Sequence, residues 1–245
     1  MPATETPDPE HPSPGAPGVS DGRAARTERL LWAELATVAL APLLLLSLPI
    51  QQVRFLALYL LAGYCLVRMF KNGTAGTYLR FDWTACRAAL PAILLRSAIA
   101  WLAVAGLVLW LYPDQFLCLP QSSLAFTLLI VVGYGLVSVL PQEVAFRGYA
   151  AWRLDGLNMS FLPTALISAA IFGWVHIIFG SWMSAVLAFF AGIVFYRTYR
   201  VKRSLAAVWV EHTLFGAAVF VLGLHHLFYR GPSLDQFASL CMGNP

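Results

Sequence analysis

The sequence predicts an all-α fold, a polytopic bundle of about seven to eight transmembrane helices. Of the 245 residues, 59% are hydrophobic and only 11% are charged, whereas a soluble domain carries about 25% charged residues. The mean hydropathy is +0.70. The apolar stretches are continuous and of helix length, unlike the short alternating strands of a membrane barrel. These observations exclude a soluble enzyme and a disordered chain, and four cysteines are too few for a disulfide scaffold.

Three regions are expected along the chain. Residues 1–29 form a Pro-rich cytoplasmic tail; its first 22 residues hold six Pro and four acidic residues, a composition that cannot bury enough apolar surface to fold. Residues 30–230 form the membrane domain, with the chemically informative motifs in residues 135–225. Residues 231–245 form a short C-terminal tail.

The membrane domain is expected to contain seven spans, because about 20 apolar residues cross a hydrocarbon core as a helix. These spans are 31–49, 54–70, 89–111, 122–140, 161–179, 183–199 and 204–224. A further helical segment, 142–154, follows Pro141, and this proline is expected to kink or break the fourth helix.

Positive charges predict the orientation of the spans. They gather on one side of the membrane at Arg23, Arg26, Arg29, Arg68, Lys71, Arg80, Arg87, Arg147, Arg153, Arg197, Arg200, Lys202 and Arg203. The loops 112–121 and 180–182 on the other side contain no Lys or Arg. This pattern predicts a multi-pass protein with a cytoplasmic N-terminus, and we expect it in a bacterial inner membrane. The same pattern explains the net charge of +4, so membrane lipids are expected partners and nucleic acid is not.

Ionisable residues within apolar spans are costly and often functional. Here they are Glu34, Arg96, Glu143, Arg147, His176, Glu211 and His212. Glu143 and Arg147 are four residues apart and share a helix face, so they are expected to form an ion pair. A structural role, in which the two charges neutralise each other, accounts for this ion pair as well as a functional role does. Glu34 and Arg96 are interpreted as paired with each other or snorkelling at span ends.

The second group of polar residues lies beyond a turn near residues 155–160. In an antiparallel hairpin that rises about 1.5 Å per residue, Glu143 and His176 reach the same depth to within about one helical turn. A carboxylate and an imidazole at one level can position and deprotonate water. His212 follows in the last span and can stabilise a developing oxyanion. Glu211 either orients His212 or faces another helix, and His225 and His226 are interpreted as interfacial residues.

The order Glu-x-x-x-Arg, then Phe-x-x-x-His, then a late intramembrane His resembles the CAAX-protease and bacteriocin-processing (CPBP, or Abi) family. The matching residues are Glu143, Arg147, Phe172, His176 and His212. The resemblance implies a glutamic intramembrane endopeptidase. In the family, a Glu and the His of the second motif are thought to activate water, while the last His is thought to form the oxyanion hole.

Two residues depart from the family pattern. Gln142 stands where the family usually has the first of two Glu, and Gly216 stands where an Asn usually follows the last His. Because an amide is not basic, Glu143 is expected to supply the carboxylate. The predicted site is therefore Glu143, His176 and His212 as catalytic residues, supported by Arg147, Gln142, Phe172 and Gly216.

The predicted function is hydrolysis of a peptide bond in a membrane-anchored or hydrophobic substrate, without a metal or cofactor. The alternative from the same fold is a weak or inactive homologue that acts in bacteriocin immunity or as a binding partner. A zinc peptidase is less favoured, because the chain has no HExxH helix and its cysteines have no metal-ligand spacing. A transporter is also less favoured, because no internal repeat is visible.

Overall fold

The computed structural model describes residues 29–30, 33–34, 36–37, 40–45 and 51–228. The chain divides into two units, residues 1–38 and 39–245, and the second unit holds all of the site residues. The predicted tails therefore lie outside the described residues except for Arg29, and the predicted span 31–49 lies partly outside them. The remaining predicted spans can be compared with the structure.

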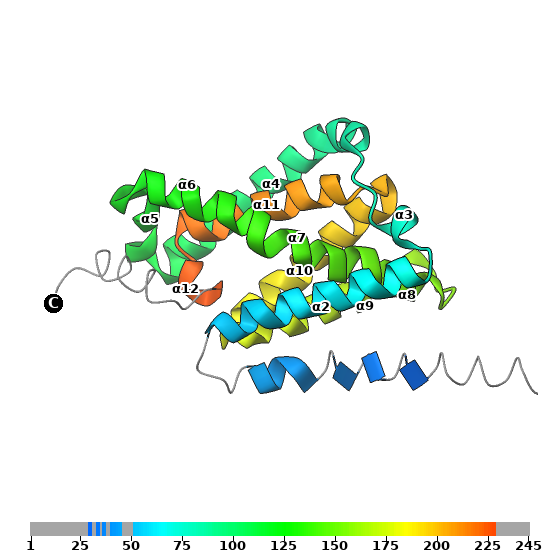
Figure 1. The fold of residues 1–245 in the computed structure, drawn as a ribbon. Helices are drawn as coiled ribbons and strands as arrows, with labels where there is room; N and C mark the ends of the chain where they lie inside the picture. Colours follow the sequence, from blue (N-terminus) through cyan, green and yellow to red (C-terminus); the bar gives the residue numbers. More distant parts are fainter. Residues whose placement is uncertain (1–28, 31–32, 35, 38–39, 46–50, 229–245) are drawn as a thin grey trace, which may run out of the picture. The chain divides into compact units, whose positions relative to one another are not determined.

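The described part of the second unit is helical, which confirms the predicted all-α bundle (Figure 1). Its elements in chain order are α2 Gln51–Lys71, α3 Ala75–Tyr78, α4 Trp83–Leu111, η1 Pro113–Gln115, α5 Cys118–Ser122, α6 Leu124–Gly133, η2 Tyr134–Val139, α7 Leu140–Glu143, η3 Val144–Tyr149, α8 Ala150–Asp155, α9 Phe161–Val175, η4 His176–Phe179, α10 Trp182–Lys202, α11 Leu205–Leu222 and α12 His225–Phe228. Among the described residues, six helical runs are long and apolar enough to cross a membrane. The protein is an integral membrane protein.

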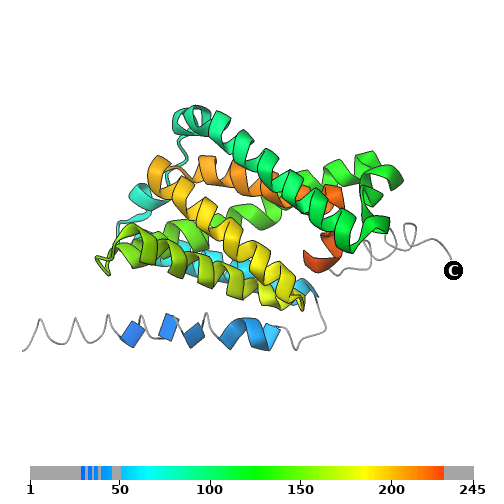
Figure 2. The ribbon, with the colours of Figure 1, turned by 180° about the vertical axis from the view of Figure 1, so that it is seen from behind.

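Helix α11 lies at the centre of the described bundle. It packs against α4 on one side, against α10 on another, and against the run from α6 to α7 (Figure 1). Viewed from behind, α10 runs between α9 and α11 (Figure 2). Two-thirds of the α11 span is buried inside the protein, against 17–39% for the other spans. Polar side chains on α11 are therefore shielded from lipid by protein on several sides.

The expected break at Pro141 does not occur. Residues Leu124–Asp155 form one helical run of 32 residues, so the segments predicted at 122–140 and 142–154 are continuous. The run instead contains two π-helical segments, η2 and η3. Pro141 has no N–H for the carbonyl of Val137 four residues earlier, and that carbonyl accepts a hydrogen bond from the Tyr59 hydroxyl at 2.8 Å. A neighbouring helix thus supplies the donor that the proline lacks.

Serine and aspartate side chains cap the N-termini of four helices. Asp82, Ser123, Ser181 and Ser204 each accept from a backbone N–H in the first turn of α4, α6, α10 and α11 respectively. The starts of α4 and α11 are also joined, because Leu205 N donates to Arg80 O at 2.8 Å. The far end of α11 is fixed at Gly223, whose φ is +114° and whose added Cβ would lie 2.2 Å from Gln115 O. Only glycine meets both conditions.

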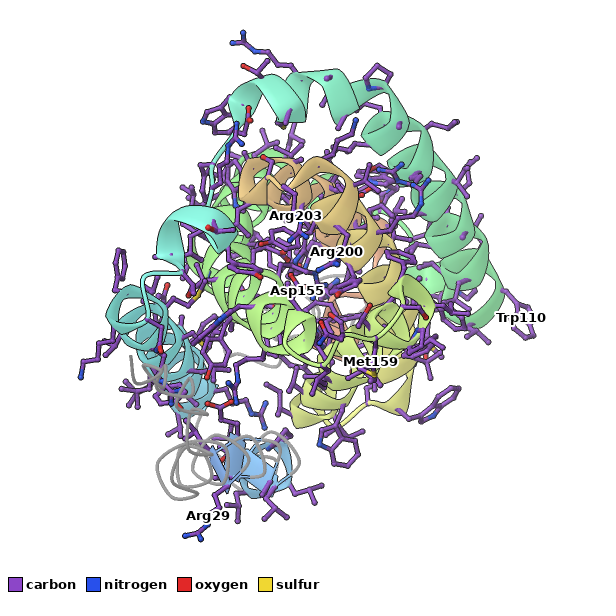
Figure 3. All side chains as sticks on the ribbon, turned by 90° about the vertical axis from the view of Figure 1, so that its right-hand side faces the viewer. Arg29, Trp110, Asp155, Met159, Arg200 and Arg203 are labelled. Carbon is purple, nitrogen blue, oxygen red and sulfur yellow. The ribbon has the colours of Figure 1, made fainter. Side chains whose placement is uncertain are left out.

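A second cluster closes one end of the bundle. Arg200 and Arg203, at the end of α10, lie beside Asp155 at the end of α8 (Figure 3). Asp155 also accepts from the Tyr78 hydroxyl at 2.9 Å. Two of the basic residues that predict the orientation, Arg200 and Arg203, thus lie together and form ion pairs with the same acid. Arg147, by contrast, is fully buried within its helix rather than in a loop.

Ser204→Ala is expected to lower the free energy of unfolding by about 1–2 kcal/mol. The fully buried Ser204 hydroxyl caps α11 through Ala207 N at 3.3 Å and donates to Asp82 O at 2.9 Å. Thermal unfolding in detergent measures the change. The matched control is Ser160→Ala, because Ser160 precedes α9 without making a side-chain cap. An equal loss in both variants would contradict the assignment.

Candidate active site

The centre of the candidate site is the Glu143 carboxylate, which is 0% exposed. Glu143 Oε1 lies 2.6 Å from Nδ1 of His212 on α11. Glu143 Oε2 lies 3.7 Å from Nε of Arg147, so the predicted ion pair four residues apart along the helix is confirmed. The three side chains form one buried polar cluster between α7, η3 and α11. A carboxylate at this depth is tolerable only with partners of this kind.

Arg147 is stabilised largely by aromatic faces. Its guanidinium carbon lies 4.5 Å from the centroid of Phe172 and 5.6 Å from that of Phe195. One terminal nitrogen donates to Phe146 O at 3.1 Å, while Nε and the other terminal nitrogen make no hydrogen bond to the described part of the chain. Cation–π contacts of this kind gain strength where water is excluded.

His212 is held in a defined plane. Its ring stacks on Phe195 with centroids 4.6 Å apart and planes at 27°. It meets Phe172 edge to face at 5.4 Å. Because Glu143 engages Nδ1, Nε2 is the ring atom left to act on a substrate.

His176 contacts the same Phe172 ring as His212. It begins η4, where the chain tightens after α9, and its ring centroid lies 4.6 Å from that of Phe172. The two imidazole centroids are therefore at most 10 Å apart. His176 Nδ1 lies 2.7 Å from Phe172 O. A carbonyl can only accept, so Nδ1 carries the proton and the neutral ring presents a lone pair at Nε2.

Gln142 and Gly216, the two residues that differ from the family pattern, lie beside this cluster. Gln142 is 9% exposed, and its amide nitrogen donates to Ser138 O at 3.1 Å and to Ser138 Oγ at 2.9 Å. This leaves the Gln142 carbonyl oxygen as an acceptor. Gly216 is buried on α11, one turn after His212. An added Cβ at Gly216 would lie 2.1 Å from the Tyr134 ring.

The structure shows the partners of two other ionisable residues, Arg96 and Glu211. Arg96 pairs with Glu211: its Nε donates to Glu211 Oε1 at 2.6 Å, and a terminal nitrogen donates to Thr198 Oγ1 at 3.1 Å. Glu211 thus faces α4 rather than orienting His212, which is the second of the two expectations. The 100° between successive residues on a helix separates the two side chains.

His225 is buried inside the protein, which its expected place at the end of a span did not predict. It is 1% exposed, and neither ring nitrogen has a hydrogen-bond partner in the described part of the chain. Its helix, α12, packs against α10, α11 and η4. The same helix places the Phe228 ring 6.2 Å from that of His176. The position of His225 near the end of a predicted span does not indicate that this short helix packs beside the site.

The aromatic residues Phe195 and Tyr134 are the contributors that sequence reasoning missed. Phe195 touches both His212 and Arg147, and the Tyr134 ring lies 6.0 Å from that of His212. Both occur in apolar spans rich in aromatic residues, where nothing in the sequence separates them from lipid-facing neighbours. Within the described residues, no group of three His, Cys, Asp or Glu side chains is arranged to hold a metal ion.

Arg147→Met is expected to lower the free energy of unfolding by about 3–5 kcal/mol, because it leaves a buried carboxylate without its cation. The double variant Glu143→Gln/Arg147→Met is expected to recover most of that loss. Arg147→Lys is expected to recover little, since an ammonium cannot lie flat on two rings. Thermal unfolding in detergent compares the variants, and equal stability of the single and double variants would contradict the coupling.

Stability is expected to fall as the pH drops from 7 toward 4, in part through His225. Burial lowers the pKa of His225 to about 4, against about 6.5 in an unfolded chain. Between these values the unfolded chain binds a proton that the folded chain does not, so acid favours unfolding. His225→Leu should reduce the loss of melting temperature between pH 7 and pH 5. An unchanged pH dependence would show that His225 does not titrate on unfolding.

Comparison with known proteins identifies the segment that carries the motifs. No curated protein and no solved structure matches the chain. Residues 123–218, however, match the family model described as Rce1-like: Type II CAAX prenyl endopeptidase Rce1-like. All three motifs and the Glu143–His212 contact fall within this segment. The match confirms the resemblance predicted from the motifs: this part of the chain is similar to the type II CAAX prenyl endopeptidases.

Proposed function

We propose that the protein is an intramembrane endopeptidase that hydrolyses a peptide bond of a membrane-anchored or hydrophobic substrate. The observation that carries the proposal is the buried contact of 2.6 Å between Glu143 and His212, together with His176, whose ring contacts the same Phe172 ring as His212. The match of residues 123–218 to an endopeptidase family supports the same reaction class.

His176 is assigned the role of proton acceptor. Its Nδ1–H is used by Phe172 O, so the lone pair on Nε2 can take a proton from water. The sequence assigned this step to Glu143 and His176 together. The geometry favours His176, because the Glu143 carboxylate is 0% exposed and already engages His212 and Arg147. Glu143 then acts as a positioning residue through His212.

Gln142 is assigned the role of orienting the attacking water. Its amide nitrogen is committed to Ser138, so its carbonyl oxygen can accept a hydrogen bond from the water. An acceptor that orients water does not need to be basic. The departure from the usual Glu is thus compatible with catalysis, at a reduced rate.

The reaction balances with these groups alone. The water oxygen forms a bond to the carbonyl carbon while one water proton passes to Nε2 of His176. The carbonyl oxygen takes the negative charge. His212, held as the imidazolium by the Glu143 carboxylate on Nδ1, donates to this oxygen through Nε2–H. The tetrahedral intermediate then collapses, the C–N bond breaks, and the leaving amine takes the proton from His176. The products are a carboxylate and an amine.

The proposal includes the sidedness of the protein. The Lys and Arg pattern supports a cytoplasmic N-terminus in a bacterial inner membrane. The Asp155, Arg200 and Arg203 cluster then lies at the cytoplasmic end of the bundle. Hydrophobic substrates would reach the site laterally from the bilayer, as expected for a site enclosed by apolar helices.

Cleavage of a pooled library of membrane-anchored peptides tests the proposal. Purified wild type should cleave, and His176→Ala should lose activity by at least about 10²-fold. Glu143→Gln should also lose activity, because a neutral amide can accept from His212 Nδ1–H but cannot stabilise the imidazolium that donates to the oxyanion. A chelator should have no effect. The matched control is Glu211→Gln, which removes the neighbouring buried acid that faces Arg96. Equal losses in Glu143→Gln and Glu211→Gln would indicate general destabilisation rather than catalysis.

Gln142→Glu separates this proposal from a non-catalytic role. If wild type is active, the added carboxylate should raise the rate. If wild type is silent and only Gln142→Glu cleaves, the endopeptidase proposal fails. The natural function is then binding or bacteriocin immunity on a peptidase fold.

A further inference from the structure

The Tyr134 ring occupies the space that a side chain at Gly216 of α11 would take. A Cβ built on Gly216 would lie 2.1 Å from Tyr134 Cε1 and 2.4 Å from its hydroxyl oxygen. Carbon atoms do not approach so closely, so the phenol ring fills the volume that any larger residue at position 216 would need. Tyr134 comes from η2, about 80 residues earlier in the chain.

The filled position adjoins the candidate site. Gly216 is four residues after His212, so both lie on one face of α11. The Tyr134 ring meets the His212 ring edge to face, with centroids 6.0 Å apart and planes at 78°. On its other side, the Tyr134 ring tilts against Phe220 at 5.2 Å. The phenol is therefore held between two α11 side chains, with its hydroxyl over Gly216.

The backbone around Tyr134 is also tied to α11. The next residue, Gly135, accepts a hydrogen bond at its carbonyl from Trp209 Nε1 at 2.7 Å. An added Cβ at Gly135 would lie 2.9 Å from Thr213. The π-helical segment and α11 thus approach closely at two consecutive residues. A donor carried on such a support is fixed before the substrate arrives, which is the condition for electrostatic catalysis.

The Tyr134 hydroxyl is free to donate. No hydrogen bond joins it to the described part of the chain, whereas the hydroxyls of Tyr59, Tyr78 and Tyr199 are all engaged. The residue is half-buried, so its hydroxyl is not sealed in the core. A phenol is a donor of ordinary strength for an oxyanion.

We propose that Tyr134 is a second oxyanion donor, acting beside His212 from the place that a side chain at position 216 would take. This proposal rests on the proposed endopeptidase function. The tetrahedral oxygen would accept from Tyr134 Oη–H and from His212 Nε2–H. The proton of Tyr134 stays on its oxygen, so no further group is needed to balance the step.

Tyr134→Phe tests the proposal, because it keeps the ring that packs on Gly216 and removes only the donor. Its kcat for a peptide cleaved by the wild type should fall by about 10²–10³-fold, with KM unchanged. The control Tyr64→Phe removes a phenol hydroxyl from the exposed face of α2 and should leave kcat unchanged. A purely packing role predicts no change in kcat for Tyr134→Phe.

A paired exchange checks that the donor, not the tyrosine, is required. Gly216→Asn alone should disrupt the site, because its Cβ meets the Tyr134 ring. Tyr134→Ala alone should be nearly inactive. The double variant Tyr134→Ala/Gly216→Asn removes the clash and provides an amide donor from α11, so its kcat should exceed that of Tyr134→Ala by at least about tenfold.

The outcomes separate the two proposals. A wild type that cleaves no peptide overturns the endopeptidase function and the Tyr134 role with it. A wild type that cleaves, with Tyr134→Phe at the same kcat, overturns only the Tyr134 role. A change confined to KM also overturns it, because a transition-state donor acts on kcat.

Discussion

Most of the structure depends on the need to bury a carboxylate and a guanidinium where water is absent. Glu143 and Arg147 are both 0% exposed, and an isolated charge at such a place would cost several kcal/mol. Their separation of 3.7 Å is too long for a strong direct hydrogen bond. The remaining compensation comes from His212 on the carboxylate and from two phenylalanine rings on the guanidinium. This is why α9, α10 and α11 must all meet at one level of the bundle.

The helix that carries Glu143 meets a second constraint, that of unpaired backbone carbonyls. Pro141 removes the helical donor for the carbonyl of Val137, and side chains donate to several carbonyls of this run. Trp209 donates to Gly135, Tyr59 to Val137, and Gln142 to Ser138. These bonds satisfy in protein what water would satisfy in a soluble helix. They also fix Gln142, so its carbonyl oxygen has a defined direction rather than the freedom of a surface amide.

The sequence predicts the class of fold and the ion pair between Glu143 and Arg147, for physical reasons. Apolar runs of about 20 residues leave few alternatives to helices. Ionisable residues within such runs are easily recognised as candidates, because they are costly to bury and therefore rare there. Hairpin arithmetic predicts that residues near 143 and 176 reach a similar depth. It does not give rotation about the helix axis, because a helix turns by 100° per residue. Hairpin arithmetic therefore does not predict that His212 is the partner of Glu143, or that Glu211 is turned toward Arg96. Aromatic residues such as Phe195 and Tyr134 escaped notice because they cost nothing in an apolar span.

In the role proposed for Tyr134, a site position moves from one helix to another while its place in space stays the same. Loss of a side chain from α11 would ordinarily leave a void beside His212, and voids of that size are unstable. A ring from η2 fills the volume, and its hydroxyl brings a hydrogen-bond donor to the same spot. An alignment of motifs would record only the missing residue at 216. The local chemistry depends instead on which atoms occupy the space next to the imidazole, and a departure in sequence is not by itself a departure in function.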